Sequence, residues 1–260
     1  MCELYLHSAP APTRRHPGLA EFFSHAEPPW DNPDGWGAAF FSALDGDPDA
    51  QLFHEPVSAT HSALARWVAA HPPESALVIG HIRKGSEGGV ILANTQPLSR
   101  FSHGRRVVFA HNGSVADLRD TQEGRALAHR ALGTADSEIA LLRFLDWKGE
   151  RTLAQCAADF PSYAREMAGF GPFNVILSDG SDTLAYSDRR KHAADGEDAG
   201  FRGPGLYLRR TEAGGLVLTS EPMMDGMEME GVARGTTLHI RSADIVSQVE
   251  GEPAPVDKAA

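Results

Sequence analysis

The residue with the clearest chemical potential is Cys2, which directly follows the initiator Met1. A small side chain at position 2 permits cellular removal of methionine, and this would leave a thiol and a free α-amino group on one residue. A thiol has an ordinary pKa near ~8.5 and an α-amino group near ~7.7–8.0, so part of the amine is unprotonated at neutral pH. Cys2 would then combine a nucleophile with its own base. The alternative is that Cys2 is an arbitrary second residue.

Two polar groups follow predicted buried strands, at positions where residues distant in sequence can meet. Arg83 ends the apolar strand that begins at Ala76, and its guanidinium suits bidentate capture of a carboxylate. A surface ion pair is the alternative for Arg83. Asn112 and Gly113 follow the strand predicted over 106–111 and are ordinarily just a turn. The functional interpretation uses the Asn112 amide and the Gly113 backbone N–H as two donors to an oxyanion.

A third polar group, Asp136, opens a helix predicted to run through Trp147. We expect Asp136 at the N-cap, a position that favours aspartate. Its carboxylate could also hold a substrate ammonium group, and the two roles can coexist.

Composition limits the classes of protein to which the chain can belong. The 260 residues, with 42% hydrophobic and 23% charged residues, fit a globular protein of one large domain or two small ones. A net charge of −11 argues against nucleic-acid binding, which needs a basic face. No apolar run approaches the roughly 20 residues that span a bilayer, and no signal peptide is recognised. We therefore expect a cytoplasmic protein that binds neither nucleic acid nor membrane.

Cysteine and histidine spacing predicts neither disulfides nor a metal centre. The two cysteines do not form a disulfide framework, and Cys156, in a helical pattern, is interpreted as a buried structural thiol. The 12 histidines include no His-Glu-x-x-His motif and no close Cys/His cluster. No P-loop, Gly-x-Gly-x-x-Gly or Gly-x-Ser-x-Gly motif is present. The expectation is therefore no metal and no cofactor.

Hydrophobic patterning predicts strands at both ends of the chain and helices between them. A first strand, 2–7, begins at the nucleophile and is ended by Ser8–Pro12. Further strands are predicted over 38–41, 51–54, 76–83, 106–111, 173–178, 183–187, 206–208, 216–219 and 236–240, the last clear one. Helices are predicted over 59–71, 136–147 and 152–167, and a long loop over 188–205. This order indicates an α+β protein, and periodicity takes the fold no further.

Six short motifs occur in one order along the chain. They are Met1-Cys2-Glu3-Leu4, Asp34-Gly35-Trp36-Gly37, His81-Ile82-Arg83, Asn94-Thr95-Gln96-Pro97, His111-Asn112-Gly113 and Asp136-Ser137-Glu138. Each is weak alone, but the ordered set behind Cys2 resembles the class II glutamine amidotransferases, the N-terminal-nucleophile type. The resemblance spans roughly residues 2–240 and is closest to stand-alone members without a fused synthase domain.

The resemblance implies a four-layer α/β/β/α sandwich of two antiparallel sheets, occupying residues 2–250, with 251–260 as a disordered tail. It implies hydrolysis of a γ-glutamyl amide, glutamine or a conjugate, through a thioester on Cys2. Asn112 and Gly113 then correspond to the oxyanion hole, Arg83 to the clamp on the substrate carboxylate and Asp136 to the ammonium contact. The Gly-rich segment after Arg83 resembles the family's lid over the glutamine pocket. The family often carries a threonine soon after this arginine, and here only Ser86 could supply the corresponding hydroxyl.

Three functions stay open at this point. The protein could hydrolyse a larger γ-glutamyl amide alone, or it could be a glutaminase subunit that passes ammonia to a separate synthase. It could also be a degenerate member that only binds γ-glutamyl compounds, although the retained Cys2, Arg83, Asn112 and Asp136 speak against this.

Overall fold

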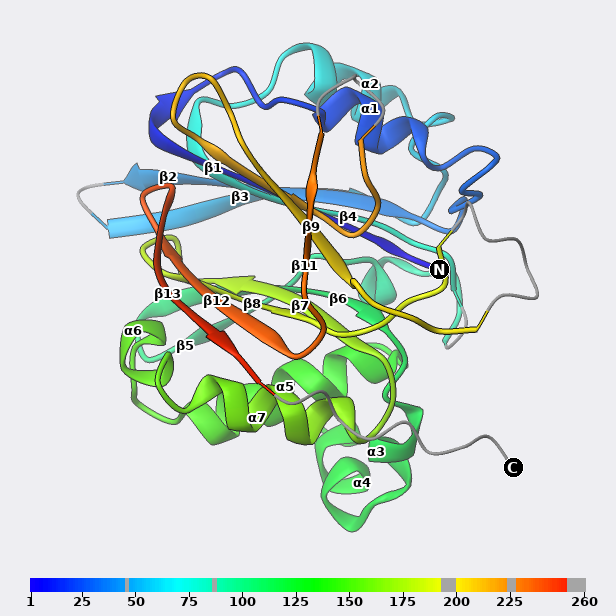
Figure 1. Cartoon of the computed structure of the whole chain (residues 1–260). Coiled ribbons are helices and arrows are strands. Elements are labelled where there is room, and N and C mark those ends of the chain that lie inside the picture. The colour runs from blue at the N-terminus through cyan, green and yellow to red at the C-terminus, as the bar shows by residue number, and fades with distance from the viewer. Residues whose placement is uncertain (45–46, 86–87, 193–199, 224–227, 252–260) are drawn as a thin grey trace.

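Two antiparallel sheets lie face to face in the computed structural model (Figure 1). The structure describes residues 1–44, 47–85, 88–192, 200–223 and 228–251. The first sheet has the order β11-β9-β10-β1-β4-β2-β3 and the second the order β13-β12-β8-β7-β6-β5. The strands of the first sheet are β1 (Glu3–Thr13), β2 (Trp36–Leu44), β3 (Asp47–Glu55), β4 (Ser75–Ile82), β9 (Leu206–Arg210), β10 (Leu216–Thr219) and β11 (Glu230–Val232). Those of the second are β5 (Leu98–Ser102), β6 (Arg105–Gly113), β7 (Phe173–Ser178), β8 (Thr183–Ser187), β12 (Thr236–Arg241) and β13 (Asp244–Glu250).

Helices cover the outer face of each sheet, as Figure 1 shows. Over the first sheet lie α1 (Leu19–Ser24) and α2 (Ala63–Ala70). Over the second lie α3 (Ala116–Asp120), α4 (Gln122–Ala128), α5 (Asp136–Lys148), α6 (Leu153–Cys156) and α7 (Phe160–Ala168). A short 3-10 turn, η1 (Leu92–Asn94), precedes β5. The expected α+β sandwich of four layers is confirmed.

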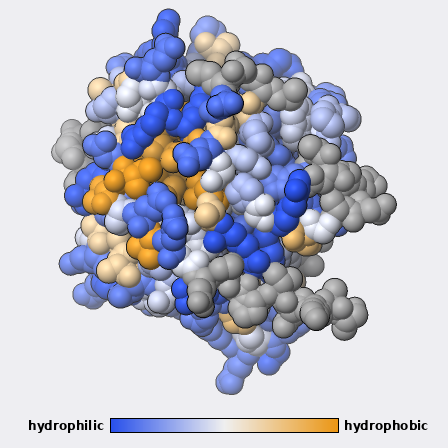
Figure 2. All heavy atoms as spheres, viewed as in Figure 1, coloured by the Kyte–Doolittle hydropathy of each residue, from blue (hydrophilic) through white to orange (hydrophobic). Residues whose placement is uncertain are grey.

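Side-chain alternation along the strands creates three apolar cores. In β4, Leu77 and Ile79 enter the core between the sheets, whereas Val78 and Ile82 face α1 and α2. Successive side chains of a strand point to opposite faces, so a strand covered on both sides is apolar throughout. Figure 2 shows an apolar patch on the face of the molecule where β9 and β13 lie in Figure 1. Leu208 on β9 and Ile245 on β13 are partly buried and pack against the core between the sheets.

Several element boundaries differ from the sequence prediction. β1 does not end at Ser8 but continues to Thr13, with an irregularity after Ser8. Proline is tolerated there because Pro10 and Pro12 lie in an exposed stretch where β1 has lost regular pairing. The helix predicted over 152–167 is two helices, because Pro161 cannot donate a backbone hydrogen bond inside a helix and instead occupies the first turn of α7.

Two further expectations differ from the structure, and a third is not tested by it. Thr236–Arg241 is not the last strand, because β13 pairs along it. Asn112 and Gly113 do not end β6 as a turn but are its last two residues, paired with β7. Residues 252–260 of the predicted tail and residues 193–199 of the predicted 188–205 loop lie outside the described residues. No helix within the described ranges is long and apolar enough to cross a membrane.

Candidate active site

Cys2 lies directly before β1, the strand that is paired on one side with β4 and on the other with β10. Its thiol donates to the Lys84 carbonyl at 3.3 Å, and the Lys84 N–H lies 3.4 Å from the sulfur. Burial raises the pKa of the Cys2 thiol above its ordinary value, while the bond from Lys84 and the charge of Arg83 oppose this rise. The thiol therefore needs a base or a positive neighbour to ionise near neutral pH.

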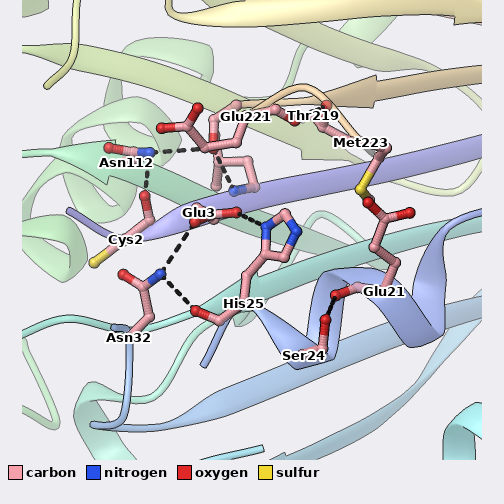
Figure 3. A network of polar contacts seen from close by, with 12 residues as sticks. Cys2, Glu3, Glu21, Ser24, His25, Asn32, Asn112, Thr219, Glu221 and Met223 are labelled. Carbon is pink, nitrogen blue, oxygen red and sulfur yellow. Dashed lines mark hydrogen bonds and ion pairs between the residues drawn. The ribbon is translucent and has the colours of Figure 1, made fainter. Parts of the chain in front are cut away.

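Asn112 reaches Cys2 from the opposite sheet, as Figure 3 shows. Its Nδ2 donates to the Cys2 carbonyl and, at 3.2 Å, to the hydroxyl of Ser220. Ser220 follows β10 and also accepts the Leu4 N–H at 2.8 Å. The fully buried Asn112 amide thus donates to the residue before β1 and to the residue after β10.

Gly113 occupies a position that only glycine fits. Its φ of 153° lies in a region that side chains rarely adopt, and a Cβ there would lie 1.7 Å from the Pro172 carbonyl oxygen. The requirement shows that the Asn112–Gly113 backbone is held tightly at the end of β6.

Arg83 follows β4 and is 4% exposed. Its backbone N–H donates to the Gly35 carbonyl at 2.7 Å, and its guanidinium donates to the Gly88 carbonyl at 3.3 Å. A Cβ at Gly85 would lie 2.8 Å from Nη1, so the backbone after Arg83 passes directly over the guanidinium. The positive charge of Arg83 is near enough to Cys2 to influence its pKa.

Asp136 is the first residue of α5, and Ala135 holds the N-cap position that we expected for Asp136. The carboxylate accepts the Val115 N–H at 2.6 Å and the Ser137 N–H at 2.9 Å. It therefore ties the turn after Gly113 to the start of α5. Its negative charge also acts on the Cys2 thiol, so the structure gathers Cys2, Arg83, Asn112 and Asp136 at one end of the sandwich. Ser86, the expected lid hydroxyl, lies outside the described residues.

A buried polar network next to Cys2 was missed by the sequence analysis. Glu3 is 2% exposed, and its carboxylate lies 2.7 Å from His25 Nδ1 and accepts from Asn32 Nδ2 at 3.1 Å (Figure 3). Asn32 also donates to the His25 carbonyl at 3.0 Å. The Trp30 ring stacks on His25 with 3.7 Å between the ring centroids. The only sequence signal is an acidic residue within an otherwise apolar strand.

The loop that carries Trp30 and Asn32 also holds the segment against which the thiol lies. Asp31 pairs with Lys84 at 3.1 Å, and the Asp34 carboxylate accepts the Gly85 N–H at 2.7 Å. Through these contacts and those of Glu3, residues 30–34 fix the spacing between Cys2 and residues 83–85. We call residues 30–34, Glu3 and His25 the nucleophile bracket.

Asn174, on β7, supports the opposite side of the site. It is fully buried, and its Nδ2 donates to the Asn112 carbonyl and to the Arg189 carbonyl, both at 3.0 Å. Its Oδ1 accepts the Asp188 N–H at 2.8 Å. An asparagine in the apolar run of β7 was the available signal, and its partners are far away in sequence.

Met1 precedes Cys2 in this structure, so the free α-amino group is that of Met1. Burial lowers the pKa of this amine, and the positive charges of Arg190 and Lys84 lower it further, against the raising effect of the Cys2 thiolate. The surroundings of this amine thus favour its unprotonated form, which is the form that a base needs.

Comparisons with known proteins identify the family to which the chain belongs. A family model described as "Glutamine amidotransferases class-II" matches residues 1–196. The protein "Putative glutamine amidotransferase YafJ" of Escherichia coli is 34% identical over 201 residues, which cover 74% of this chain and 75% of that protein.

Two solved structures share the fold. A predicted glutamine amidotransferase from Pseudomonas aeruginosa has a TM-score of 0.59 at 22% identity, covering 95% of this chain and 100% of that one. Glutamine phosphoribosylpyrophosphate amidotransferase from B. subtilis has a TM-score of 0.64 at 15% identity and matches 96% of this chain, which spans 49% of that longer chain. Because the family model covers most of the chain, and the E. coli relative is 34% identical over about three quarters of both chains, this chain belongs to the class II glutamine amidotransferase family.

Proposed function

We propose that the protein hydrolyses a γ-glutamyl amide through a thioester on Cys2, after removal of Met1. The observation that carries the proposal is the approach of Asn112 to Cys2 from the opposite sheet. An amide donor that reaches the residue bearing the thiol could serve an acyl-transfer reaction as an oxyanion donor.

In the first step the thiolate attacks the γ-carbonyl carbon and the carbonyl oxygen becomes an oxyanion. The Asn112 Nδ2 and the Gly113 backbone N–H are the proposed donors. The Asn112 N–H that contacts Ser220 at 3.2 Å is the one an oxyanion would take over, since Ser220 already accepts from Leu4. Removal of one such donor typically lowers turnover about 10²–10³-fold.

The α-amine of Cys2 is the proposed proton carrier, and its first role precedes the attack. It accepts the thiol proton and gives it to the leaving nitrogen as the C–N bond breaks and the thioester remains. Water attacks the thioester, glutamate leaves, and the thiol is restored. Every step uses groups of Cys2 itself, which explains why a free N-terminus is required.

Substrate recognition is assigned to Arg83 and Asp136. Arg83→Lys keeps the charge but loses the planar fork, so KM should rise strongly with little change in kcat. Asp136→Asn should raise KM as well, and its melting temperature reports any loss of the bond to Val115. Unchanged glutamine affinity in both variants would show that the two residues do not bind the glutamyl group.

The decisive experiment labels the nucleophile. A glutamine-like diazoketone should add one label to the parent protein lacking Met1, as read by intact mass. Cys2→Ala should take no label and hydrolyse nothing, and Cys2→Ser should be nearly inactive. Cys156→Ala, which removes the other cysteine, is the matched control and should be labelled and active. Full activity of Cys2→Ala, or an active protein that retains Met1, would overturn the mechanism.

The substrate panel separates the remaining alternatives. With purified protein, kcat/KM is compared for glutamine and bulkier γ-glutamyl amides. Preference for bulky amides supports a hydrolase that acts alone, which we favour. Glutamine as best substrate, with turnover raised by a separate synthase, indicates a glutaminase subunit instead, and binding without turnover indicates a non-catalytic protein.

A further inference from the structure

Gln96 belongs to the one motif of the sequence analysis, Asn94-Thr95-Gln96-Pro97, that the proposed mechanism does not use. It lies just before β5 and is 4% exposed. The pairing of β5 with β6 ends at Leu98 and Phe109. Continuing this antiparallel register by two residues places Gln96 opposite His111, where the backbone of β5 would otherwise meet β6.

The side-chain amide of Gln96 binds both backbone polar groups of His111. Its Oε1 accepts the His111 N–H at 2.7 Å, and its Nε2 donates to the His111 carbonyl at 3.3 Å. One side chain therefore does what a peptide group of a neighbouring strand does elsewhere in the sheet. A buried N–H that loses its acceptor costs about 1–3 kcal/mol, so this contact holds the backbone of His111 in place.

Ser137 connects the same amide to the His111 ring. Gln96 Nε2 donates to Ser137 Oγ at 3.2 Å, and this oxygen lies 2.9 Å from His111 Nδ1. His111 Nε2 lies 3.3 Å from the Pro172 carbonyl, which can only accept, so Nε2 carries the proton and Nδ1 accepts from the Ser137 hydroxyl. This chain requires a neutral ring, and burial lowers the pKa of His111 below its ordinary value.

The two proposed oxyanion donors follow His111 directly in the chain. After them comes Ser114, whose N–H donates to the Pro172 carbonyl at 3.1 Å. Since His111 Nε2 contacts the same carbonyl, the segment that carries both donors is held at both ends. Gln96 holds the first of these ends, so a displacement of His111 would move both donors.

The start of α5, where the ammonium contact is proposed, has supports of its own. The Asp136 carboxylate is bound by the two backbone N–H groups described above. Asn94 Oδ1 accepts the N–H groups of Thr134 and Ala135 at 2.7 and 3.1 Å. None of these four bonds involves the Gln96 side chain. Loss of the Gln96 amide should therefore disturb the oxyanion donors more than the binding of the glutamyl group.

We propose that Gln96 is a positioning residue for the oxyanion site: its side-chain amide takes the place of a neighbouring strand beside His111 and thereby fixes Asn112 and Gly113 relative to Cys2. The inference rests on the proposed hydrolase function. Gln96 acts through His111 and takes no part in bond making. Because a misplacement of about 1 Å can cost roughly 10²-fold in rate, its effect should appear in turnover.

The first test is the division of the effect between kcat and KM. In the protein lacking Met1, Gln96→Met should lower kcat for the best γ-glutamyl substrate about 10–10²-fold and change KM by less than about twofold. Gln96→Asn keeps the amide but shortens its reach, so it gives the same readout if Gln96→Met does not fold. Parental kcat in a folded variant, or an effect confined to KM, would overturn the proposal.

Ser75→Ala is the control for a general loss of stability. Ser75 is fully buried at the opposite end of β4, where its hydroxyl contacts the Phe41 and Leu77 carbonyls, both at 2.7 Å. This variant should lower the melting temperature and keep the parental kcat. An equal loss of kcat in Ser75→Ala would show that destabilisation alone explains the effect of Gln96→Met.

The second test combines Gln96→Met with Asn112→Ala. If Gln96 acts by holding Asn112, the double variant should lose less kcat than the product of the two single losses, because the donor that Gln96 positions is already gone. Losses that multiply would overturn the positioning role and leave the hydrolase intact. Failure of the parent to hydrolyse any γ-glutamyl amide would instead overturn the proposed function.

Discussion

Replacement of Glu3 by glutamine tests whether the nucleophile bracket stabilises the fold. The carboxylate meets two partners, His25 at 2.7 Å and Asn32 at 3.1 Å, with only 2% of Glu3 exposed to solvent. Glutamine offers one acceptor oxygen and one NH2 group, so one of these bonds is lost and two donors face each other. A charge-assisted hydrogen bond contributes about 1.5–3 kcal/mol, so the free energy of unfolding should fall by roughly 2–4 kcal/mol. Salt should change this little, because a buried pair is weakly screened.

The assay is thermal unfolding of Glu3→Gln beside Glu212→Gln, an exposed glutamate on the β9–β10 turn. One kcal/mol shifts the melting temperature of a protein of this size by roughly 2–4 °C, so a loss of roughly 2–4 kcal/mol should lower the melting temperature of Glu3→Gln by about 4–16 °C. The double variant Glu3→Gln/His25→Gln should lose less free energy of unfolding than the two single variants lose together, because both changes remove the same contact. Equal melting temperatures for Glu3→Gln and Glu212→Gln would refute the reasoning.

Three other perturbations have expected outcomes. Gly113→Ala should introduce roughly 1–3 kcal/mol of backbone strain in addition to the clash with Pro172, and both the melting temperature and hydrolysis should fall; a variant with parental values would contradict the close approach. Asn174→Ala should lower kcat more than it changes KM, because it releases the Asn112 carbonyl; a pure KM effect would contradict this role. Burial and the nearby His16 lower the pKa of His7 to about 4, below its ordinary ~6.5, so the unfolded chain binds the proton more readily. Stability should therefore fall as pH decreases from about 6.5 to 4, and less steeply in His7→Gln if the protein still folds; identical slopes would exclude His7 as a cause.

Patterns that are local in sequence predicted much of the fold. The runs 173–178 and 183–187 were predicted as strands, and β7 and β8 have these bounds. The four-layer arrangement, in contrast, came from the family resemblance. Strand pairing such as that of β1 with β10 depends on contacts between residues that are distant in sequence, and hydrophobic periodicity does not predict such contacts.

The candidate site likewise contains residues that local sequence patterns selected and residues that only the tertiary structure revealed. Cys2, Arg83, Asn112 and Asp136 were selected by residue type and position at element ends, and the structure gathers them. The roles assigned to them stay predictions. His25, Asn32 and Asn174 were not selected, because a buried polar side chain acquires its partner only through tertiary packing. Asp136 was misplaced by one residue because its carboxylate accepts from Val115 across a loop instead of capping its own helix.

The central position of β1 has a consequence for biosynthesis. One neighbour, β10, pairs Thr219 with Tyr5, a separation of 219 − 5 = 214 residues. At roughly 5–20 residues per second, about 10–40 s of translation pass between the emergence of the two strands. Until then the first strand lacks a partner along one edge, and the chain's start is open to the enzymes that remove methionine. Once β10 is in place and Lys191 packs against Met1, that access closes. Maturation of the nucleophile would therefore be timed by the length of the polypeptide that separates two neighbouring strands.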